Sequence, residues 1–594
     1  MRLPQLAITG CFLIALAIRV IAQIEHPAHI TAHAFIRMHD GVHLAANIFR
    51  PAEHGRFPAI LVRTPYGKGV EMSAHYHAFV DRGYAVVAQD VRGRYESQGV
   101  FSPLDQEPRD GDDTINWIAA QPWSDGGVGM MGGSYLGISQ WEVAVLNNPH
   151  LKAIFPIVSG DDDYRDRFYS TGGAFKLGNR LLWTSENMRL AGYDPPDFWK
   201  FIWTLPVRKT DVVATGHKSP MLQQAFDHPS EDAFWKNLST RRKLKDFHVP
   251  VFTVGGWYDN FVESDLDAFS ILRKHSSIDR IVIGPWPHNM SIPITTVDYG
   301  PHALVPLRRT QLEWFDQWLK HKDMPLTSQP PVRIFVMGVD QWRDEQEWPL
   351  ARARETRFYL KSDGHANTVF GDGVLSPEPA TGSARDEFVY DPQHPVPTVG
   401  GAVCCNPDVF PWGPIDQRKV EKRKDVLVYS TPPLADDLEV TGPIEVVLHA
   451  ASSVPDTDFT AKLVDVYPNG QAMNLTDGIL RARYRNSLEK PKLMKSGRIY
   501  KFTIDVGVTS NVFRKGHRIR LEISSSNFPR FDRNPNTGRP VADETQLAKA
   551  SQTIHHDQLH DSYLLLPVIP QPLPRLTSTA PTRYFAKRSA SLAR

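Results

Sequence analysis

Residues 128–137 read VGMMGGSYLG, and this stretch decides the fold. Its first four residues are mostly apolar and predict a buried strand, while a helical pattern follows Ser134 up to about residue 146. A strand, a sharp turn and a helix in this order expose the turn residue, where a serine acts as a nucleophile. The usual second glycine of such a turn is Leu136 here, and Gly137 follows it. The string alone also fits a glycine-rich packing turn. Residues elsewhere in the chain must therefore decide between a catalytic and a packing role for Ser134.

Segments on both sides of this stretch alternate between strand and helix patterns. Such alternation is typical of a parallel sheet with helices on both faces, so we predict an α/β domain in two parts, residues 24–158 and 248–348. The segments with an apolar strand pattern or a helical pattern are 59–63, 84–88, 112–120, 249–254, 263–274, 280–284 and 308–321.

Residues 159–247 have a different character. They carry many aromatic side chains on stretches that look helical and do not alternate with strands. We interpret this segment as a helical cap inserted into the α/β domain.

Residues 349–590 predict an all-β domain. Short strand patterns recur there at 426–429, 444–449, 459–466 and 500–506, separated by Pro, Gly, Asn and Asp. Charged Arg518, Arg520 and Glu522 alternate with apolar neighbours, which predicts a further strand with one wet face. Many short strands at this density suggest a sandwich such as a jelly roll.

Composition and charge narrow the class of partner. The 594 residues are too many for one core, and 41% of them are hydrophobic, which argues against disorder. Lys plus Arg (67) balance Asp plus Glu (66), so no net field favours nucleic acid or an anionic membrane. The expected partner is a small molecule, and association into a homo-oligomer is left open.

The N-terminus predicts export. Residues 1–23 combine Arg2, an apolar run and small residues before Gln23, as a signal peptide does. We therefore expect a secreted or periplasmic protein without stable membrane insertion. Because Arg19 interrupts the apolar run, an uncleaved anchor is an alternative, and a lipoprotein modified at Cys11 is another.

Cysteine is scarce in the rest of the chain. Without Cys11, only Cys404 and Cys405 remain, so no disulfide framework is expected. The adjacent pair is either a vicinal disulfide or two buried thiols, and we assign it no catalytic role.

The acid and base that would activate Ser134 should follow it in that order, each after a later strand of the same sheet. Asp259 follows the strand ending at 254–256, and His288 follows the strand ending at 283–285. His288 would act as the general base, while Asp259 would hold its tautomer. Chain order alone leaves competitors, which are Asp265 and Asp267 for the acid and His302 for the base.

An acyl transfer also needs donors for the developing oxyanion. The backbone N–H of Tyr135, directly after the nucleophile, is one candidate. The phenol of Tyr66, which follows an early strand, is a second candidate. Spacing alone favours ordinary aromatic packing for Tyr66.

Five ordered motifs make the chain recognisable. RTPY (63–66), QDVRG (89–93), GGSYLG (132–137), GWYD (256–259) and GPWPH (284–288) together closely resemble the cocaine-esterase-like family of hydrolases. That family also contains α-amino-acid ester hydrolases, glutaryl-cephalosporin acylases and X-prolyl dipeptidyl-peptidases. The resemblance extends from about residue 35 to 570.

The resemblance implies an α/β-hydrolase domain with an inserted helical cap and a C-terminal jelly roll of galactose-binding-like type. It also implies roles for five residues. Ser134 is the nucleophile, Asp259 the acid and His288 the base. The Tyr66 hydroxyl and the Tyr135 N–H form the oxyanion hole.

Substrate preference is less determined. Asn260 and Phe261 follow Asp259 where amino-ester hydrolases carry further acids, which weakens an amino-acid substrate. Asp161, in an acidic turn at the cap entrance, is a candidate for recognising a substrate ammonium, although a solvated turn is the alternative. Trp183 and Trp257 are further candidate substrate contacts, favouring an apolar or aryl acyl group.

The leading hypothesis is a serine hydrolase of carboxylic esters, which extends to activated amides. An X-Pro dipeptidyl-peptidase or another exopeptidase, or a β-lactam side-chain acylase, of the same fold is the alternative. A carbohydrate-binding module with an inert hydrolase domain is a remote one. No metal cluster, phosphate-binding loop or cofactor motif is apparent in the sequence, so we expect no cofactor.

Overall fold

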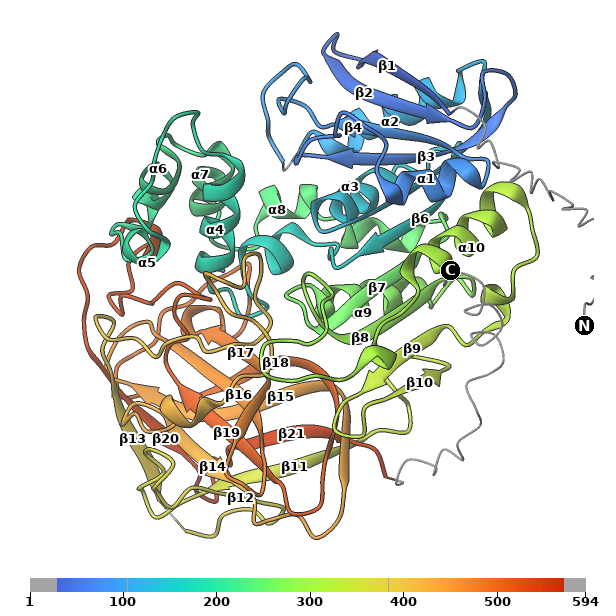
Figure 1. Ribbon diagram of the computed structural model, residues 1–594. Coiled ribbons are helices and arrows are strands. Elements are labelled where there is room, and N and C mark those ends of the chain that lie inside the picture. The colour runs from blue at the N-terminus through green and yellow to red at the C-terminus, as the bar shows by residue number, and fades with distance from the viewer. Residues whose placement is uncertain (1–28, 104, 383, 571–594) are drawn as a thin grey trace, which may run out of the picture.

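The structure is a computed structural model that describes residues 29–103, 105–382 and 384–570. Its strands form two sheets, one in each half of the chain, and a group of helices lies beside both (Figure 1). The predicted signal peptide at residues 1–23 lies outside the described residues, as do residues 571–590 of the predicted C-terminal domain.

The first sheet has the strand order β1-β2-β4-β3-β5-β6-β7-β8-β9-β10. Neighbours from β4 to β9 along this order pair in parallel, whereas β1, β2 and β10 add antiparallel pairs at the two edges. The strands are β1 (Ile30–Arg37), β2 (His43–Arg50), β3 (Phe57–Thr64), β4 (Ala85–Asp90), β5 (Ser124–Gly133), β6 (Leu151–Ile157), β7 (Phe252–Tyr258), β8 (Arg280–Pro287), β9 (Val332–Val336) and β10 (Gln341–Glu345).

Helices cover both faces of this sheet, as the alternating pattern predicts. The apolar sides of α1 (Ala74–Asp81) and α10 (Leu307–Lys320) bury one face. Those of α2 (Glu107–Ala119), α3 (Tyr135–Ala144) and α9 (Val262–Leu272) bury the other. Since both faces are covered, the central strands are almost entirely buried, which explains their continuous apolar runs.

The parallel strands determine where the polar motifs lie. Tyr66, Ser134, Asp259 and His288 each follow a strand of this sheet at its carboxyl end, after β3, β5, β7 and β8. Carboxyl ends of parallel strands share one edge of a sheet, and this edge is where α/β proteins bind their ligands.

The segment between β6 and β7 is helical, with many of its aromatic side chains buried (Figure 1, teal and green). The π-helix η1 (Asp163–Phe168) begins it, and seven further helices follow. They are α4 (Leu177–Asn187), α5 (Phe198–Phe201), η2 (Val207–Lys209), α6 (Thr210–Thr215), α7 (Pro220–Asp227), α8 (Ala233–Leu238) and η3 (Arg241–Asp246).

The C-terminal half is an all-β domain built on a second sheet, in the order β13-β20-β15-β21-β11-β12-β14-β19-β16-β17, with β18 paired to β15. The α/β fold class with a C-terminal all-β domain is therefore confirmed. The strands are β11 (Arg354–Lys361), β12 (Val374–Ser376), β13 (Arg385–Tyr390), β14 (Leu427–Ser430), β15 (Leu438–Ser452), β16 (Asp458–Val466), β17 (Ala472–Arg481), β18 (Tyr500–Phe513), β19 (Arg518–Ser524), β20 (Ala550–His555) and β21 (Tyr563–Val568).

The strand predicted from alternating charges is present as β19, but its polar face is not wet. Arg520 forms an ion pair of 2.8 Å with Glu421, and Glu522 forms one of 3.3 Å with Lys462. These four side chains are buried. Alternation therefore predicted the strand correctly and its solvent exposure wrongly, because buried charges that pair with each other leave the same pattern in a sequence.

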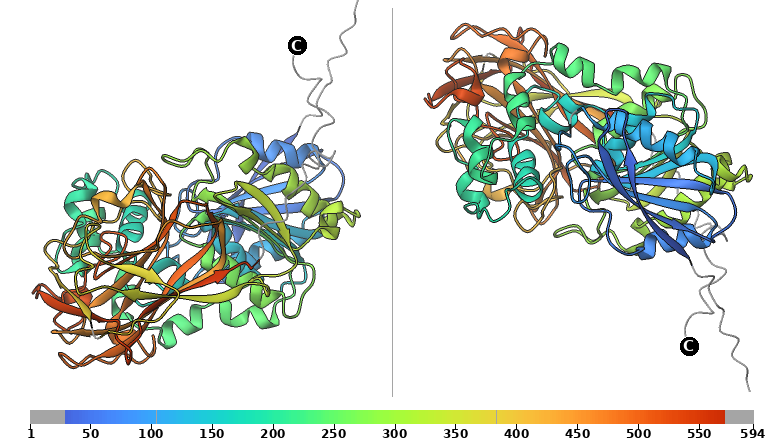
Figure 2. Two further views of the ribbon diagram at one scale, coloured as in Figure 1. Left: turned by 90° about the horizontal axis from the view of Figure 1, so that it is seen from below. Right: turned by 90° about the horizontal axis from the view of Figure 1, so that it is seen from above.

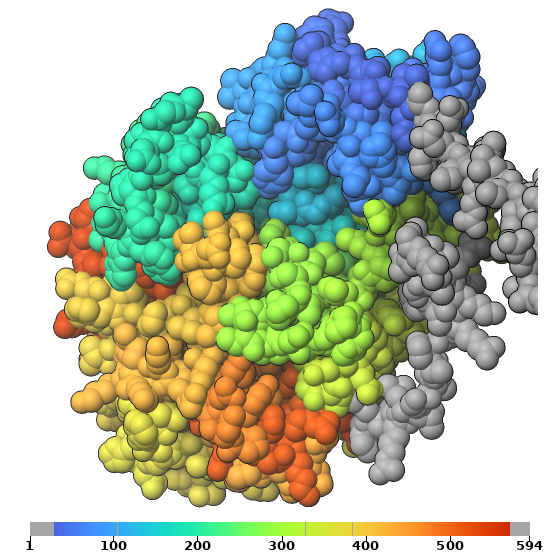
Figure 3. Space-filling view, viewed as in Figure 1, coloured from blue at the N-terminus to red at the C-terminus, as the bar shows by residue number. Residues whose placement is uncertain are grey.

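The two sheets and the helical segment share one core. A continuous cluster of buried apolar residues joins Phe168 of the helical segment, Tyr258 of β7 and Leu480 of β17. Figures 2 and 3 show the three parts in close contact, without an extended linker between them. At one junction the N–H of Arg481 donates to the carbonyl of Gly172 over 3.0 Å. Among the described residues, no helix has the length and hydropathy of a membrane span.

Replacing Gly172 should loosen this junction. A Cβ at Gly172 would lie 2.0 Å from the carbonyl oxygen of Ile479, so Gly172→Ala must displace backbone. We expect a destabilisation of about 1–3 kcal/mol, seen as a lower Tm in differential scanning fluorimetry. Gly382→Ala is the matched control, since a Cβ there meets nothing within 4 Å. Equal Tm values for the two variants would contradict the shared core.

Candidate active site

Ser134 lies on the turn between β5 and α3 in a strained conformation. Its φ of 56° and ψ of −125° are unusual for a residue other than glycine. The turn is tight, since a Cβ at Gly132 would lie 2.5 Å from the Cβ of Leu136. Glycine at position 132 therefore makes room for Leu136, which replaces the usual second glycine. The strain exposes the Ser134 hydroxyl at the carboxyl edge of the sheet.

Asp259 lies on the loop after β7 and is fully buried. Its Oδ2 accepts a hydrogen bond of 3.2 Å from the N–H of Phe261. The loop lies directly against the end of β8, because a Cβ at Gly256 would be 2.3 Å from the carbonyl oxygen of Trp286. This close approach brings the predicted acid and the predicted base together.

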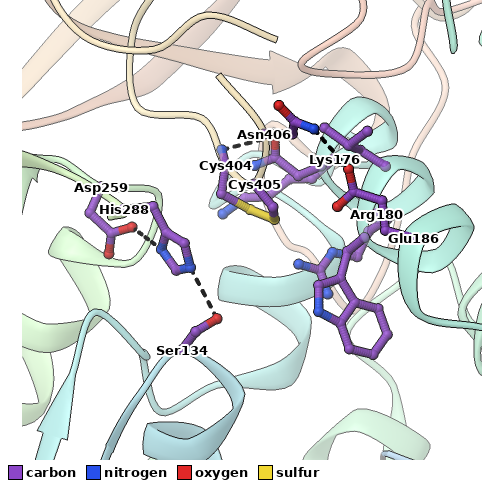
Figure 4. Close-up of a disulfide and its surroundings, with 12 residues drawn as sticks. Ser134, Lys176, Arg180, Glu186, Asp259, His288, Cys404, Cys405 and Asn406 are labelled. Carbon is purple, nitrogen blue, oxygen red and sulfur yellow. Dashed lines mark hydrogen bonds and ion pairs between the residues drawn. A yellow bond between two sulfur atoms is a disulfide. The ribbon is translucent and has the colours of Figure 1, made fainter. Parts of the chain in front are cut away.

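His288 lies between Asp259 and Ser134 and contacts both. Its Nδ1 lies 2.7 Å from Oδ1 of Asp259, and its Nε2 lies 3.0 Å from Oγ of Ser134 (Figure 4). Since the ionised carboxylate only accepts, Nδ1–H donates to Asp259 and Nε2 is free to accept from the serine hydroxyl. This arrangement can remove the serine proton as the hydroxyl attacks a carbonyl.

The competing residues lie elsewhere. His302 directs its Nε2 to the carbonyl of Asp340 at 2.9 Å. Asp267 pairs with Arg241 at 3.1 Å. Asp265 is buried below the site, where Oδ1 accepts from the N–H of Gly160 at 3.2 Å. None of the three bonds to the Ser134 hydroxyl or to His288.

Tyr66 directs its hydroxyl towards Ser134. The hydroxyl accepts a hydrogen bond of 3.0 Å from the indole N–H of Trp183. Burial raises the pKa of the Tyr66 phenol, while hydrogen bonds to Trp183 and Ser134 lower it in part. The net direction is upward, so the O–H keeps its proton into the alkaline range and remains a donor.

Tyr135 begins α3, directly after Ser134, so its N–H has no acceptor within the helix. Its phenol donates to Glu107 over 2.8 Å, and Glu107 in turn pairs with Arg63 at 2.8 Å. The ring of Tyr135 is parallel to that of Trp183, with centroids 6.2 Å apart. These contacts hold the start of the helix, and with it the free N–H, beside Ser134.

A pocket opens above Ser134. The space inside it, counted together with its open mouth, is about 390 Å³. Its walls come from α3, the helical segment, the loop after β7 and the C-terminal domain. The lining residues are Pro103, Ser134, Tyr135, Ile138, Arg167, Phe168, Arg180, Trp183, Met221, Phe261, Cys404 and Cys405.

The C-terminal domain contributes a vicinal disulfide to this wall. Cys404 and Cys405 are bonded to each other, so the disulfide alternative holds and the two-thiol alternative does not. Figure 4 shows the disulfide beside Arg180 and facing the space next to Ser134 and His288. Because the two cysteines are adjacent in the chain, this bond fixes a local piece of wall and closes no long loop.

The predicted substrate contacts differ in outcome. Trp183 lines the pocket. Trp257 does not, because its indole is buried and donates to the carbonyl of Phe335 at 2.7 Å. Asp161 is also turned away, since it pairs with Arg241 at 2.7 Å and accepts from Ser264. Neither Trp257 nor Asp161 therefore lines the pocket beside Ser134.

The sequence reading missed two features of the pocket, Arg180 and the disulfide wall. The adjacent cysteines suggest a disulfide, but nothing in the local sequence shows that it or Arg180 reaches Ser134, since packing between distant segments brings both there. Within the described ranges, no group of three or more His, Cys, Asp or Glu side chains is arranged to hold a metal ion.

Comparison with known proteins identifies related sequences. Residues 40–290 match the family model of X-Pro dipeptidyl-peptidase (S15 family), and residues 326–565 match the X-Pro dipeptidyl-peptidase C-terminal non-catalytic domain. Cocaine esterase of Rhodococcus sp. (strain MB1 Bresler) is 40% identical over 91% of this chain and 98% of its own.

Solved structures show the same architecture. An α-amino acid ester hydrolase superposes with a TM-score of 0.81 and 27% identity, over 94% of this chain and 98% of its own. An aminopeptidase from a marine sediment Thaumarchaeota archaeon superposes with a TM-score of 0.80 and 26% identity, over 91% of this chain and 96% of its own.

Reducing the vicinal disulfide should weaken substrate binding more than it changes the reactivity of Ser134. Opening the bond frees the backbone at 404–405 and loosens one wall of the pocket, while the contacts of His288 are untouched. We expect dithiothreitol to raise KM for an aryl ester, with a smaller change in kcat.

The double variant Cys404→Ser/Cys405→Ser is the control. It should show the raised KM without reductant and no further response to it. If wild-type KM is insensitive to dithiothreitol while mass spectrometry shows two free thiols, the disulfide is not part of the substrate wall.

Proposed function

Because this chain belongs to the cocaine-esterase-like family of serine hydrolases, we propose that it hydrolyses carboxylic esters through an acyl-enzyme on Ser134. The observation that carries the proposal is the continuous hydrogen-bonded chain from Asp259 through His288 to Ser134, at 2.7 and 3.0 Å. Ser134, at the end of this chain of hydrogen bonds, lines a pocket.

Acylation begins when Oγ of Ser134 attacks the ester carbonyl and His288 Nε2 takes its proton. The carbonyl oxygen becomes an oxyanion, which the Tyr66 O–H and the Tyr135 N–H stabilise. Asp259 holds the imidazolium that forms. The tetrahedral intermediate then collapses, and His288 gives the proton to the departing alkoxide, so an alcohol leaves and the acyl group stays on Ser134.

Deacylation repeats these steps with water. His288 takes a proton from the water as its oxygen attacks the acyl carbonyl, and the same donors stabilise the second oxyanion. Collapse returns the proton from His288 to Oγ of Ser134 and releases the carboxylic acid. Side chains of the chain and the backbone N–H of Tyr135 supply every group in this cycle except the water.

The family models favour one second candidate, an X-Pro dipeptidyl-peptidase. Such an enzyme needs a carboxylate for the free ammonium of its substrate. The acidic turn of the cap offers little for this purpose, because Asp161 pairs with Arg241 and Asp163 pairs with Arg167. Asp162 caps η1 and accepts from Ser239 at 2.9 Å. These pairings support the ester over the peptide.

We also propose that the protein is exported from the cytoplasm. The vicinal disulfide supports an oxidising compartment, in keeping with the signal peptide predicted at residues 1–23. The division into a cap at 159–247 and a C-terminal domain from 349 also belongs to the proposal, as does association into a homo-oligomer.

Ser134→Ala should abolish turnover of a short-chain 4-nitrophenyl ester. The variant removes only the nucleophilic oxygen, so the fold should persist and Tm should stay near the wild-type value. Labelling by a fluorophosphonate probe should disappear with the activity. Turnover that survives in the folded variant would refute the acyl-enzyme on Ser134.

Tyr66→Phe should lower kcat by about 10²–10³-fold, the effect of losing one oxyanion donor. KM should change less, because the donor acts mainly on the transition state. Since burial raises the pKa of Tyr66, the phenol stays protonated beyond the usual pH of about 10. The wild-type advantage over the variant should therefore persist at pH 9.5. Its disappearance by that pH would contradict the raised pKa of Tyr66. A variant with the wild-type kcat would remove Tyr66 from the mechanism.

Ester and peptide specificity can be compared on one preparation. We expect kcat/KM for a simple aryl ester to exceed that for an X-Pro-4-nitroanilide, because no free carboxylate of the acidic turn awaits an ammonium. The two rates are followed by release of nitrophenol and nitroaniline. Faster cleavage of the anilide would reverse the ranking of the two candidates.

A further inference from the structure

Arg180 is a charged side chain inside the Ser134 pocket that the proposed mechanism does not use. It lies in the first turns of α4 and is only 6% exposed, yet it lines the pocket. Figure 4 shows it on the same side as the disulfide, across the pocket from Ser134 and His288.

The guanidinium of Arg180 has no counter-ion among the described residues. Its Nε is buried without a hydrogen-bond partner, and its neighbour on one side is the ring of Phe168, 5.6 Å from Cζ. Burial and the repulsion of Arg167 lower the pKa of Arg180 to about 10, so the group keeps its charge at neutral pH.

Arg167 is the informative contrast. It lies in the same pocket and is equally buried, but it forms ion pairs with both Glu142 and Asp163. Burial raises the pKa of Glu142 and of Asp163, and the charge of Arg167 lowers both in part, so each carboxyl depends on Arg167 for its charge. The nearby carboxylates therefore form ion pairs with Arg167, and none forms an ion pair with Arg180 among the described residues.

An unpaired buried guanidinium is unfavourable, and buried charges in proteins are normally paired. A solvated surface position would avoid that cost, and so would a neutral side chain. The arrangement is stable when an anion enters the pocket, since the planar guanidinium binds a carboxylate with two parallel hydrogen bonds.

Arg180 lies close to the atoms that would react, so an anion bound to it would lie close to them too. Trp183 follows three residues later on α4, and residues at this spacing share a helix face. The Trp183 indole reaches the Tyr66 hydroxyl at 3.0 Å, and the charge of Arg180 acts on the same hydroxyl. An anion at Arg180 would therefore lie a few atoms from a carbonyl attacked by Ser134.

We propose that Arg180 binds a second, anionic group of the ester, so that the preferred substrates are esters that also carry a carboxylate. This inference rests on the proposed ester hydrolysis and names its substrate class. The carboxylate belongs to the acyl half, as in the half-ester of a dicarboxylic acid, or to the alcohol half, and the two cases are separated by the choice of substrate.

The test compares matched neutral and charged esters. For the acyl half, the pair is 4-nitrophenyl pentanoate and the mono(4-nitrophenyl) ester of glutaric acid. For the alcohol half, it is methyl 4-acetoxybenzoate and 4-acetoxybenzoate. Rates are corrected for spontaneous hydrolysis. We expect kcat/KM for the charged member to exceed that for the neutral member by about 10- to 100-fold in one of the pairs.

Arg180→Gln should reduce that charged-to-neutral ratio by about the same factor, and Arg180→Lys should retain part of it. Arg189→Gln is the matched control, because Arg189 lies just beyond the same helix on an exposed surface, and its ratio should equal that of the wild type. Fluorophosphonate titration of Ser134 counts the folded active sites in each preparation.

The inference is overturned if the wild type shows no preference for the charged member of either pair, or if Arg180→Gln leaves the ratio unchanged. Should Arg180→Gln fail to fold, competitive inhibition of the wild type decides, with glutarate expected to bind at least about tenfold more tightly than glutaramide. Equal inhibition would overturn it. Absence of turnover for all esters would instead refute the proposed function itself.

Discussion

The imidazole of His288, held between a buried carboxylate and a strained serine, is the constraint on which the rest of the site depends. Its two hydrogen bonds, 2.7 Å to Asp259 and 3.0 Å to Ser134, join loops that follow β8, β7 and β5. A shift of about 1 Å in any of these loops would break one bond. Close contacts oppose this shift, since a Cβ at Gly132 would collide with the Leu136 side chain and a Cβ at Gly256 with the Trp286 backbone.

The same sheet leaves the substrate site incomplete. Its carboxyl edge provides the proposed nucleophile, acid and base, but much of the pocket wall comes from the helical segment and the C-terminal domain. A shared apolar core holds these parts together, which explains how a disulfide in the second half of the chain reaches Ser134. We therefore assign the chemistry to the edge of the sheet and the selection of the ester to the helical segment and the C-terminal domain.

Much of this could be predicted from the sequence, because apolar runs mark buried strands and the order of nucleophile, acid and base follows the strands. The pairing of charged side chains could not be predicted from the sequence. Arg167 and Arg180 look alike in the sequence, and only packing gives Arg167 two carboxylates and Arg180 none. For the same reason Asp161 looks like a recognition site and pairs internally, and Trp257 looks like a pocket wall and packs in the core.

The central claim is that ester hydrolysis passes through a covalent acyl group on Ser134. Rapid-quench mass spectrometry measures this directly, on wild-type protein mixed with a 4-nitrophenyl ester and digested after acid quenching. The account predicts an acyl mass increment on the peptide that contains Ser134, appearing within the first turnover and decaying when substrate is exhausted. An unmodified peptide during steady turnover, or an increment on another residue, would contradict it.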